Sequence, residues 1–252
     1  MHAALLDLVE GEPERLPVES DLEGSLPALD VESTRYLDGE EIYHGTAADL
    51  VEQSAEDVTV TPSGIETERI EELEKVATDW YADFDAGWIG FDSSDGEFVS
   101  EILAARHGVE VFEGAIDVDA FAEHLSEKDI SGAWQTGRKK TLDDDGEASR
   151  VEINYHDSAS LRAAAQGDNV QLGFRYTWGD MRVRGTVTRS GYVALYTSTT
   201  TPVFARWMRE EVVPFLTTEM RLEQKEERQS NQSTLEKQDT YAGGVSDERR
   251  RR

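Results

Sequence analysis

Apolar and polar residues alternate most regularly between residues 170 and 200, and this alternation predicts an antiparallel sheet. Every second residue is apolar through 172–178, and the same spacing continues with Met181, Val183 and Val187 after the pair Gly179-Asp180. Two such segments joined by a glycine-containing pair predict a β-hairpin in which Trp178 lies opposite Met181. One face of this hairpin would carry Leu172, Phe174, Tyr176, Trp178, Met181, Val183 and Val187. A third strand over 192–199 adds Val193 and Leu195 to that inner face.

The first half of the chain shows helical spacing instead. Ser63-Gly64-Ile65-Glu66 has the form of a capping box, and Ile70, Leu73, Ala77, Trp80 and Phe84 follow it at three- and four-residue intervals. This pattern predicts a surface helix over residues 65–84. Four more strands are expected, over residues 41–44, 88–91, 109–116 and 151–155. Further helices are expected over residues 46–53, over residues 119–125, and in a segment that ends at Gly108. A last helix should run from Pro202 to residue 216, and Pro214 should bend it.

These elements predict an α+β fold, with an antiparallel sheet from about residues 133–199, helices packed on one face of it, and flexible termini. The expected core residues are Trp134, Phe174, Tyr176, Trp178, Val183, Leu195, Phe204 and Trp207. We expect three parts: an acidic, partly extended segment over 1–60, a single core domain over 61–218, and a flexible polar tail over 219–252.

The composition of the chain indicates a strongly acidic surface. Asp and Glu number 53 and the formal net charge is −28, while cysteine is absent. Six lysines stand beside nineteen arginines. This composition is typical of proteins from a halophile-type cytoplasm, where high salt screens the repulsion between carboxylates. A nucleic-acid mimic is the alternative, but it would need its carboxylates on one elongated face, and here they are scattered.

The same composition excludes several classes of protein. Without cysteine there is no disulfide and no thiolate metal site. No apolar run approaches the roughly 18 residues of a membrane span, and the first residues lack a signal-peptide pattern. We therefore expect a cytoplasmic protein with no membrane association.

Charge is distributed unevenly along the chain. Residues 131–209 hold eleven Lys and Arg against eight Asp and Glu, whereas residues 1–130 hold six against thirty-five. A segment that keeps its arginines in so acidic a chain predicts a surface that faces a negative ligand.

The predicted hairpin places these arginines on the face opposite the core, which we call the outer face. It carries Arg175, Thr177, Arg182, Arg184, Thr186 and Thr188, and the third strand adds Tyr192, Tyr196 and Ser198. The register sets Arg175 directly opposite Arg184, a like-charge pair that an anion would stabilise. Guanidinium groups bind phosphate through paired hydrogen bonds, and tyrosine rings stack on bases. Arg138, Lys139 and Lys140 form a second candidate anion contact at the edge of the same sheet.

The alternative interpretation is structural. The outer-face arginines would then pair with local carboxylates such as Glu152, and the basic run at 138–140 with Asp143, Asp144 and Asp145 in the following turn.

No motif specific for catalysis is present. The chain lacks a P-loop, a G-x-S-x-G motif and histidines at metal-ligand spacing, and Asp92–Glu97 does not match an EF-hand loop. We therefore expect no cofactor or metal, and predict a non-catalytic protein that binds nucleic acid or another polyanion. One alternative is an adaptor that contacts another protein. The other is an enzyme for a phosphorylated small molecule near Thr199–Thr201 and Arg206. The sequence leaves the oligomeric state open.

Overall fold

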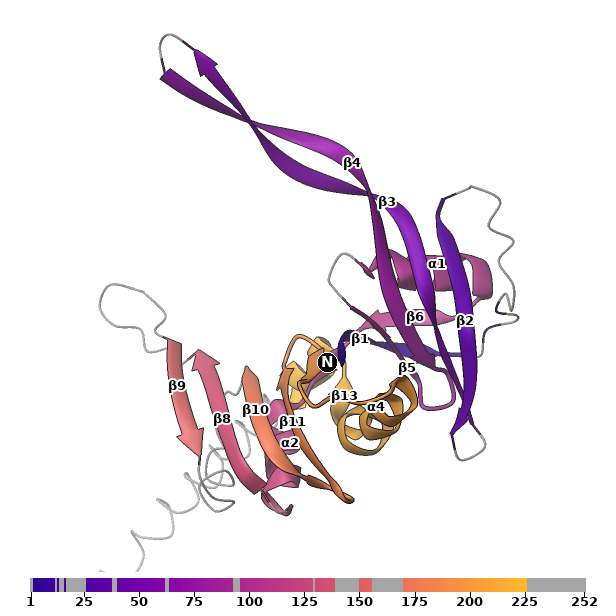
Figure 1. The fold of residues 1–252 in the computed structure, drawn as a ribbon, viewed down its shortest axis with the longest axis vertical. Coiled ribbons are helices and arrows are strands. Elements are labelled where there is room, and N and C mark those ends of the chain that lie inside the picture. Colours follow the sequence, from indigo (N-terminus) through magenta and orange to yellow (C-terminus); the bar gives the residue numbers. More distant parts are fainter. Residues whose placement is uncertain are drawn as a thin grey trace, which may run out of the picture.

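The fold is that of a computed structural model, which describes residues 2–11, 13, 16, 26–37, 40–61, 64–92, 96–128, 130–138, 150–155 and 170–225. Strands dominate it, and three helical regions pack against them (Figure 1). No helix in this part of the chain is long and apolar enough to cross a lipid bilayer.

One antiparallel sheet of eleven strands runs through the molecule, in the order β2-β3-β4-β5-β1-β12-β11-β10-β8-β9, with β6 also paired to β1. Its strands are β1 His2–Glu10, β2 Ala28–Leu37, β3 Glu40–Thr61, β4 Gly64–Asp83, β5 Trp88–Phe91, β6 Glu110–Glu113, β8 Ile130–Arg138, β9 Arg150–Tyr155, β10 Gln171–Trp178, β11 Met181–Thr188 and β12 Tyr192–Leu195. A small second sheet pairs β7, Ala115–Ile116, with β13, Leu216–Thr217. The N-terminal strand β1 therefore lies in the middle of the large sheet, between β5 and β12.

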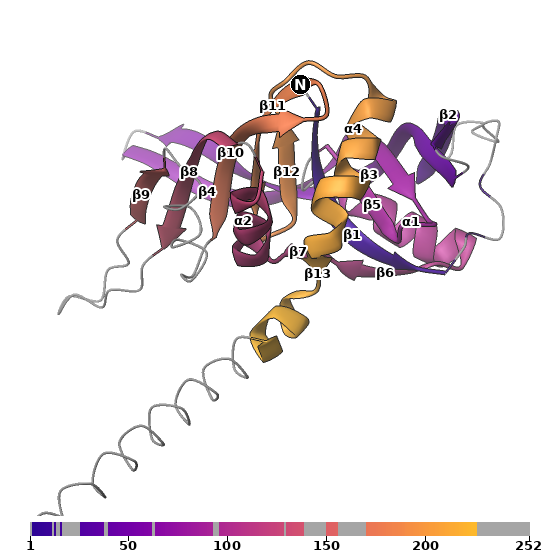
Figure 2. The same ribbon diagram turned by 90° about the horizontal axis from the view of Figure 1, so that it is seen from below.

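Three helices are α1 Phe98–His107, α2 Val118–Ser126 and α4 Thr201–Trp207, and the described residues 219–225 are also helical. The backbone after α4 continues as a π-helical turn over Met208–Val212 and a 3₁₀ turn over Val213–Phe215, so the helix expected from Pro202 to residue 216 is α-helical only as far as Trp207. Helix α4 lies between the β2–β5 part of the sheet and the β8–β12 part in both ribbon views (Figures 1 and 2).

Two apolar clusters occupy the two sides of the sheet near β1 and β5. Along β5, Trp88 belongs to one cluster, whereas Ile89 and Phe91 belong to the other, as expected when alternate residues of a strand point to opposite faces. The buried side chains of α2 and α4 join the cluster of Trp88, and those of α1 join the cluster of Ile89. The structure therefore does not show all the helices packed on one face of the sheet.

The predicted hairpin is found with its predicted register. Trp178 pairs with Met181, and Arg175 pairs with Arg184. The expected core residues Phe174, Tyr176, Val183, Leu195, Phe204 and Trp207 are all buried, and Trp178 is partly buried. The third strand is shorter than expected and ends at Leu195.

Two predicted helices are wrong. Residues 46–53 lie in β3 and residues 65–83 lie in β4, and the two strands pair continuously from Tyr43↔Ala82 to Thr61↔Gly64. The spacing of Ile70, Leu73 and Ala77 fits a helix, but pairing with a complementary strand overrides such local preference. Near the body the period is that of a strand, because Trp80 and Ala82 join one cluster and Tyr81 joins the other.

A hydrogen-bonded polar network centres on the buried carboxylate of Glu211. Glu211, which is 4% exposed, accepts hydrogen bonds from the Tyr176 hydroxyl at 3.0 Å and Lys128 Nζ at 3.1 Å, and His124 Nε2 lies 3.1 Å from its carboxylate. Trp207 Nε1 in turn donates to the Tyr176 oxygen at 2.8 Å. Burial, followed by the charge of Glu211, raises the pKa of Tyr176, so its phenol stays protonated and donates.

The π-helical turn also supplies Arg209 to a buried ion pair. Its guanidinium binds the fully buried carboxylate of Asp83 in β4, with Nε donating at 2.8 Å. The backbone N–H of Ala86 donates to the other oxygen of Asp83 at 2.9 Å. This pair ties the C-terminal helical region to the base of the long β3–β4 hairpin.

Candidate anion-binding face

The outer face is built by alternation along β10, β11 and β12. Because Phe174, Tyr176 and Val183 point into the core, their neighbours Arg175, Arg182 and Arg184 point away from it, and all three arginines are exposed. Gly179, with a φ of 55°, occupies the tight turn that fixes this register.

The arginines lie close together. Arg175 and Arg184 are direct cross-strand partners, and Arg182 faces Thr177 one step nearer the turn. Thr186 is buried and Thr188 is partly buried, so the exposed part of the outer face lies toward the hairpin turn.

Arg184 lies between two aromatic rings. Its guanidinium carbon is 5.5 Å from the centre of the Trp134 ring and 5.7 Å from the centre of the Tyr196 ring. Both distances are within the range of cation–π contacts. The rings come from strands on either side of the hairpin, Trp134 from β8 and Tyr196 from the residues just after β12.

Trp134 was expected in the core, and that expectation is wrong. It is only partly buried and pairs in register with Gly173, which shares the outer face with Arg175. A Cβ atom at Gly173 would come within 1.8 Å of Trp134 Cε2, so the indole covers the space that a side chain would fill. The glycine in β10 was the sequence signal that could have placed this tryptophan on the outer face.

Backbone contacts hold Tyr196 in place. Its N–H donates to the Arg184 carbonyl at 2.8 Å, and the Thr197 hydroxyl accepts from the Arg184 N–H at 2.9 Å. Tyr192 lies on the same face and is partly buried; its pKa is raised by burial first and then by the nearby Tyr196 and Asp92.

Within the described residues, no ion pair involves Arg175, Arg182 or Arg184. Carboxylates do neutralise arginines elsewhere, as in Arg189–Glu219 at 2.8 Å and Arg206–Glu210 at 2.7 Å. Two like unit charges in bulk water repel each other by about 1 kcal/mol even at 4 Å. A cation–π contact at an exposed site contributes about 0.5–1 kcal/mol, so the two rings offset the repulsion without any carboxylate.

The second basic group is described only in part. Arg138 is the last residue of β8 and pairs with Arg150 in the register, and its side chain lies outside the described part of the structure. Lys139 and Lys140 also lie outside the described residues, as do Asp143, Asp144 and Asp145.

The hydroxyl-rich segment before α4 is not joined to this face. Arg206 is paired with Glu210, and the Thr199 carbonyl bonds to the ring of His2 at 3.0 Å. Helix α4 begins at Thr201 with no side-chain cap from Thr200. Arg206 therefore has a protein partner, whereas the buried hydroxyl of Thr199 has none among the described residues.

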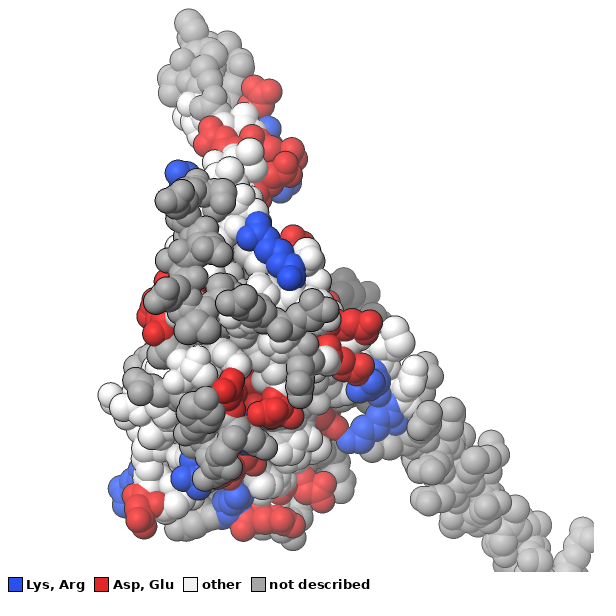
Figure 3. Space-filling model, turned by 90° about the vertical axis from the view of Figure 1, so that its right-hand side faces the viewer, with Lys and Arg blue, Asp and Glu red and all other residues white. Residues whose placement is uncertain are grey.

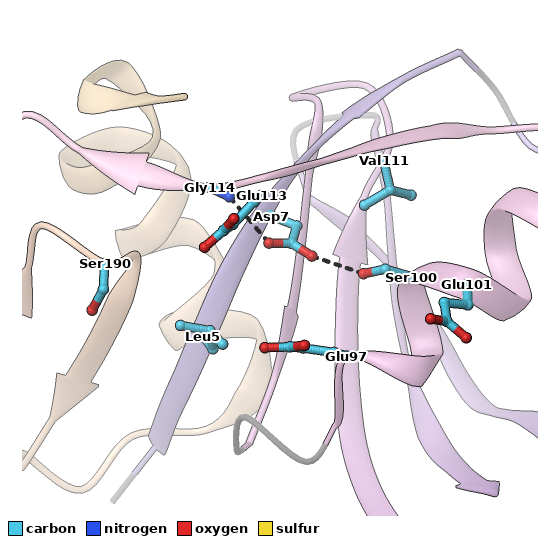
Figure 4. A pocket seen from close by; sticks show the side chains of 9 residues that line it. All are labelled: Leu5, Asp7, Glu97, Ser100, Glu101, Val111, Glu113, Gly114 and Ser190. Atoms are coloured by element: carbon cyan, nitrogen blue, oxygen red, sulfur yellow. Dashed lines mark hydrogen bonds between the residues drawn. The ribbon is translucent and has the colours of Figure 1, made fainter. Parts of the chain in front are cut away.

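An acidic pocket of about 310 Å³ opens further along the same side of the sheet (Figure 4). Its lining includes Leu5, which pairs directly with Tyr192, together with Asp7, Glu97, Ser100 and Glu113. The buried Asp7 carboxylate accepts from Ser100 Oγ at 2.8 Å and from the Gly114 N–H at 3.1 Å.

Burial raises the pKa of Asp7 more than these hydrogen bonds lower it. In the described part of the chain, no group of three or more His, Asp or Glu side chains is arranged to hold a metal ion. Because carboxylates line this pocket, the surface beyond the arginine-bearing part of the outer face is acidic.

Comparison with known proteins adds no relative: no family model matches the chain, and no curated protein matches it either. The interpretation of the outer face therefore depends on its geometry and charge.

Proposed function

We propose that the outer face binds a polyanion, and that single-stranded nucleic acid fits it best. The observation that carries the proposal is the placement of Arg184 between Trp134 and Tyr196, beside the exposed Arg175. Guanidinium groups supply paired hydrogen bonds for phosphate, and aromatic rings supply stacking surfaces for bases. A surface that combines both is the usual design for binding single strands.

The acidity of the rest of the chain supports a contact-based mode of binding. At a net charge of −28 the molecule as a whole repels nucleic acid, so diffuse attraction does not bring the two together. We place the protein in a halophile-type cytoplasm, where salt screens that repulsion and leaves direct arginine and stacking contacts to supply the affinity. We assign no catalytic step to this face.

Fluorescence anisotropy with a labelled oligothymidine of about 15 nucleotides tests the proposal at about 1 M KCl, where screening extends over only a few ångströms. The variant Arg182→Gln/Arg184→Gln should bind at least ~10-fold more weakly than the wild type, because it removes two phosphate contacts and the stacked guanidinium. The matched control is Arg206→Gln/Arg221→Gln, which makes the same change in net charge outside the outer face. Equal losses in both variants would contradict the proposal.

A second variant separates nucleic acid from other polyanions. Replacing Trp134 and Tyr196 with Leu removes the stacking surfaces and keeps every arginine. We expect oligothymidine binding to fall several-fold, since base–aromatic stacking contributes about 1–3 kcal/mol per base, while binding of heparin changes little. Equal effects on both ligands would assign the face to polyanions in general.

A further inference from the structure

The hairpin β3–β4 forms a long arm that projects from the body of the molecule, and a group of polar side chains lies on the body end of these two strands (Figure 1). The register sets His44 opposite Tyr81 and Thr46 opposite Asp79. Asp92 follows β5, and its backbone N–H donates to the Asp79 carbonyl at 3.1 Å. Cross-strand partners share a face of a sheet, as do alternate residues along one strand, so the side chains of both pairs lie on the same face.

Carboxylates gather around these residues. Thr46 Oγ1 donates to Glu32 Oε1 at 2.8 Å and lies 3.3 Å from Asp79 Oδ1, while His44 Nδ1 lies 4.0 Å from Glu32 Oε2. Among the described residues, no Lys or Arg pairs with Glu32, Asp79 or Asp92. A cavity of about 240 Å³ opens beside them, and its lining consists of Thr46, Ala77, Thr78, Asp79 and Asp92.

The Tyr81 hydroxyl has no hydrogen-bond partner among the described residues, although only 4% of the residue is exposed. The rings of His44 and Phe204 hold the Tyr81 ring, with centres 5.0 and 5.9 Å away. Burial raises the pKa of Tyr81, and the charges of Asp92, Asp79 and Glu32 raise it further, so the hydroxyl stays protonated and lies toward these carboxylates. A buried tyrosine hydroxyl usually has a partner, and one that lacks it marks a place for a bound molecule.

The charges at this place are unbalanced. Burial raises the pKa of Asp92, the charge of Asp79 raises it further, and His2 and His44 lower it. The carboxylates of Asp79 and Asp92 therefore repel each other, and a positive charge between them would remove this repulsion.

Acidity alone does not mark a site in this protein, because acidic side chains are spread along the arm and over the body on the face that Figure 3 shows. The unpartnered hydroxyl of Tyr81 distinguishes this group from the others. In the described part of the chain, no three His, Asp or Glu side chains converge closely enough to hold a metal ion. A cation that fits must therefore carry several hydrogen-bond donors of its own, as a primary ammonium group does with its three N–H bonds.

We propose that this cavity binds the primary ammonium group of a small aliphatic amine. Asp79 and Asp92 accept two of its N–H bonds, the Tyr81 oxygen accepts the third, and Ala77 contacts the methylene chain. The cavity has the volume of about eight water molecules, which is enough for an amine of a few carbon atoms. This site lies apart from the outer-face arginines and does not depend on the function proposed for them.

Isothermal titration of the full chain with 1,4-diaminobutane tests the proposal at about pH 7.5, where alkyl amines are protonated, and in about 1 M KCl, which screens diffuse attraction. We expect saturable binding with a dissociation constant in the millimolar range. Tetramethylammonium carries a positive charge but has no N–H donor, so it should bind at least ~10-fold more weakly. No saturable binding of the diamine, or equal binding of both cations, overturns the proposal.

Two variants test the assigned groups. Asp92→Asn should weaken diamine binding at least ~5-fold, because it removes one of the two charges. Its matched control, Asp180→Asn, makes the same charge change in the exposed turn of the β10–β11 hairpin and should leave binding unchanged. Equal losses in these two variants would show that the amine is held only by the overall charge, and the proposal would be wrong.

Tyr81→Phe removes the hydroxyl and keeps the ring between His44 and Phe204. It should weaken diamine binding ~3-fold or more and leave the melting temperature unchanged, because the hydroxyl has no partner among the described residues. Tyr196→Phe removes an exposed hydroxyl elsewhere and serves as the control. Diamine affinity that is the same in Tyr81→Phe and in the wild type would contradict the proposed site.

Discussion

Individual residues on the outer face show how one glycine can decide the role of a tryptophan. The Trp134 ring lies over Gly173, and in this position it contacts Arg184. The alternation of apolar and polar residues was enough to predict Arg175 opposite Arg184, because the turn at Gly179 fixes the register. It did not place Trp134, because an aromatic residue in a strand is usually part of the core, and the decisive neighbour lies 39 positions along the chain.

The buried carboxylate of Asp7 carries a pH dependence. Burial raises its pKa above 3.8 in the folded state, so folding favours the protonated form. Its contribution to stability is therefore complete below pH 3.8 and is lost as the pH rises through the raised pKa.

Asp7→Asn should remove this loss, because an amide does not ionise and still accepts from Gly114. We expect the unfolding free energy of the variant to increase relative to that of the wild type as the pH rises from about 4 to 7, by about 1.4 kcal/mol for each unit of pKa elevation. Urea denaturation at constant salt measures it. A difference that is constant with pH, or one that shifts in favour of the wild type, would contradict the assignment.

At the scale of elements, the π-helical turn after α4 determines which side chains reach the core. It places Glu211 against Tyr176 and Arg209 against Asp83, so a single irregular turn supplies the buried carboxylate of Glu211 and the cation that pairs with the buried carboxylate of Asp83. A π-helical turn inserts an extra residue and changes the direction of the side chains that follow. Both contacts therefore depend on this irregular turn.

Arg209→Met should destabilise the protein by about 3 kcal/mol, since it leaves the buried carboxylate of Asp83 without its cation. Arg206→Met is the matched control, because Arg206 forms an exposed ion pair with Glu210 in the same helical region and should cost less than about 1 kcal/mol. Urea denaturation compares the two variants. Equal losses would show that the Asp83–Arg209 pair contributes no more than a surface pair.

The sequence predicts most elements between residues 88 and 216 but not the long arm. Trp88–Phe91, the helix ended by Gly108, and the hairpin all carry strong local signals that the structure confirms. The arm was predicted as helices because its glutamates, lysine and leucines are good helix formers at helical spacing. Its strands depend on pairing between residues 43–61 and 64–82, and single-strand periodicity does not report such pairing.

For the molecule as a whole, net charge should control stability. A charge of −28 on one chain favours the expanded state through self-repulsion, and salt removes most of this penalty once the screening length falls to about 3 Å near 1 M. The melting temperature should therefore rise with KCl by at least about 5 °C between 0.1 and 1 M, and more slowly above that.

Thermal denaturation followed by circular dichroism measures this rise, and NaCl at the same ionic strength should give a rise of similar size, because screening depends on ionic strength. A melting temperature that falls or stays constant as KCl rises from 0.1 to 1 M would show that self-repulsion does not limit stability. The same titration, done at low protein concentration, keeps the effect on folding separate from any effect on association.

The position of β1 in the middle of the sheet sets the order of events during synthesis. His2–Leu5 pair with residues 192–195, so the two central strands are separated by nearly the whole described chain. Contacts between such distant positions slow folding, because a long loop must close before they form. While the ribosome is still translating, β1 exposes one hydrogen-bonding edge, and the centre of the sheet closes only after residue 195 has emerged. Truncated products that end before that point should expose this edge and aggregate.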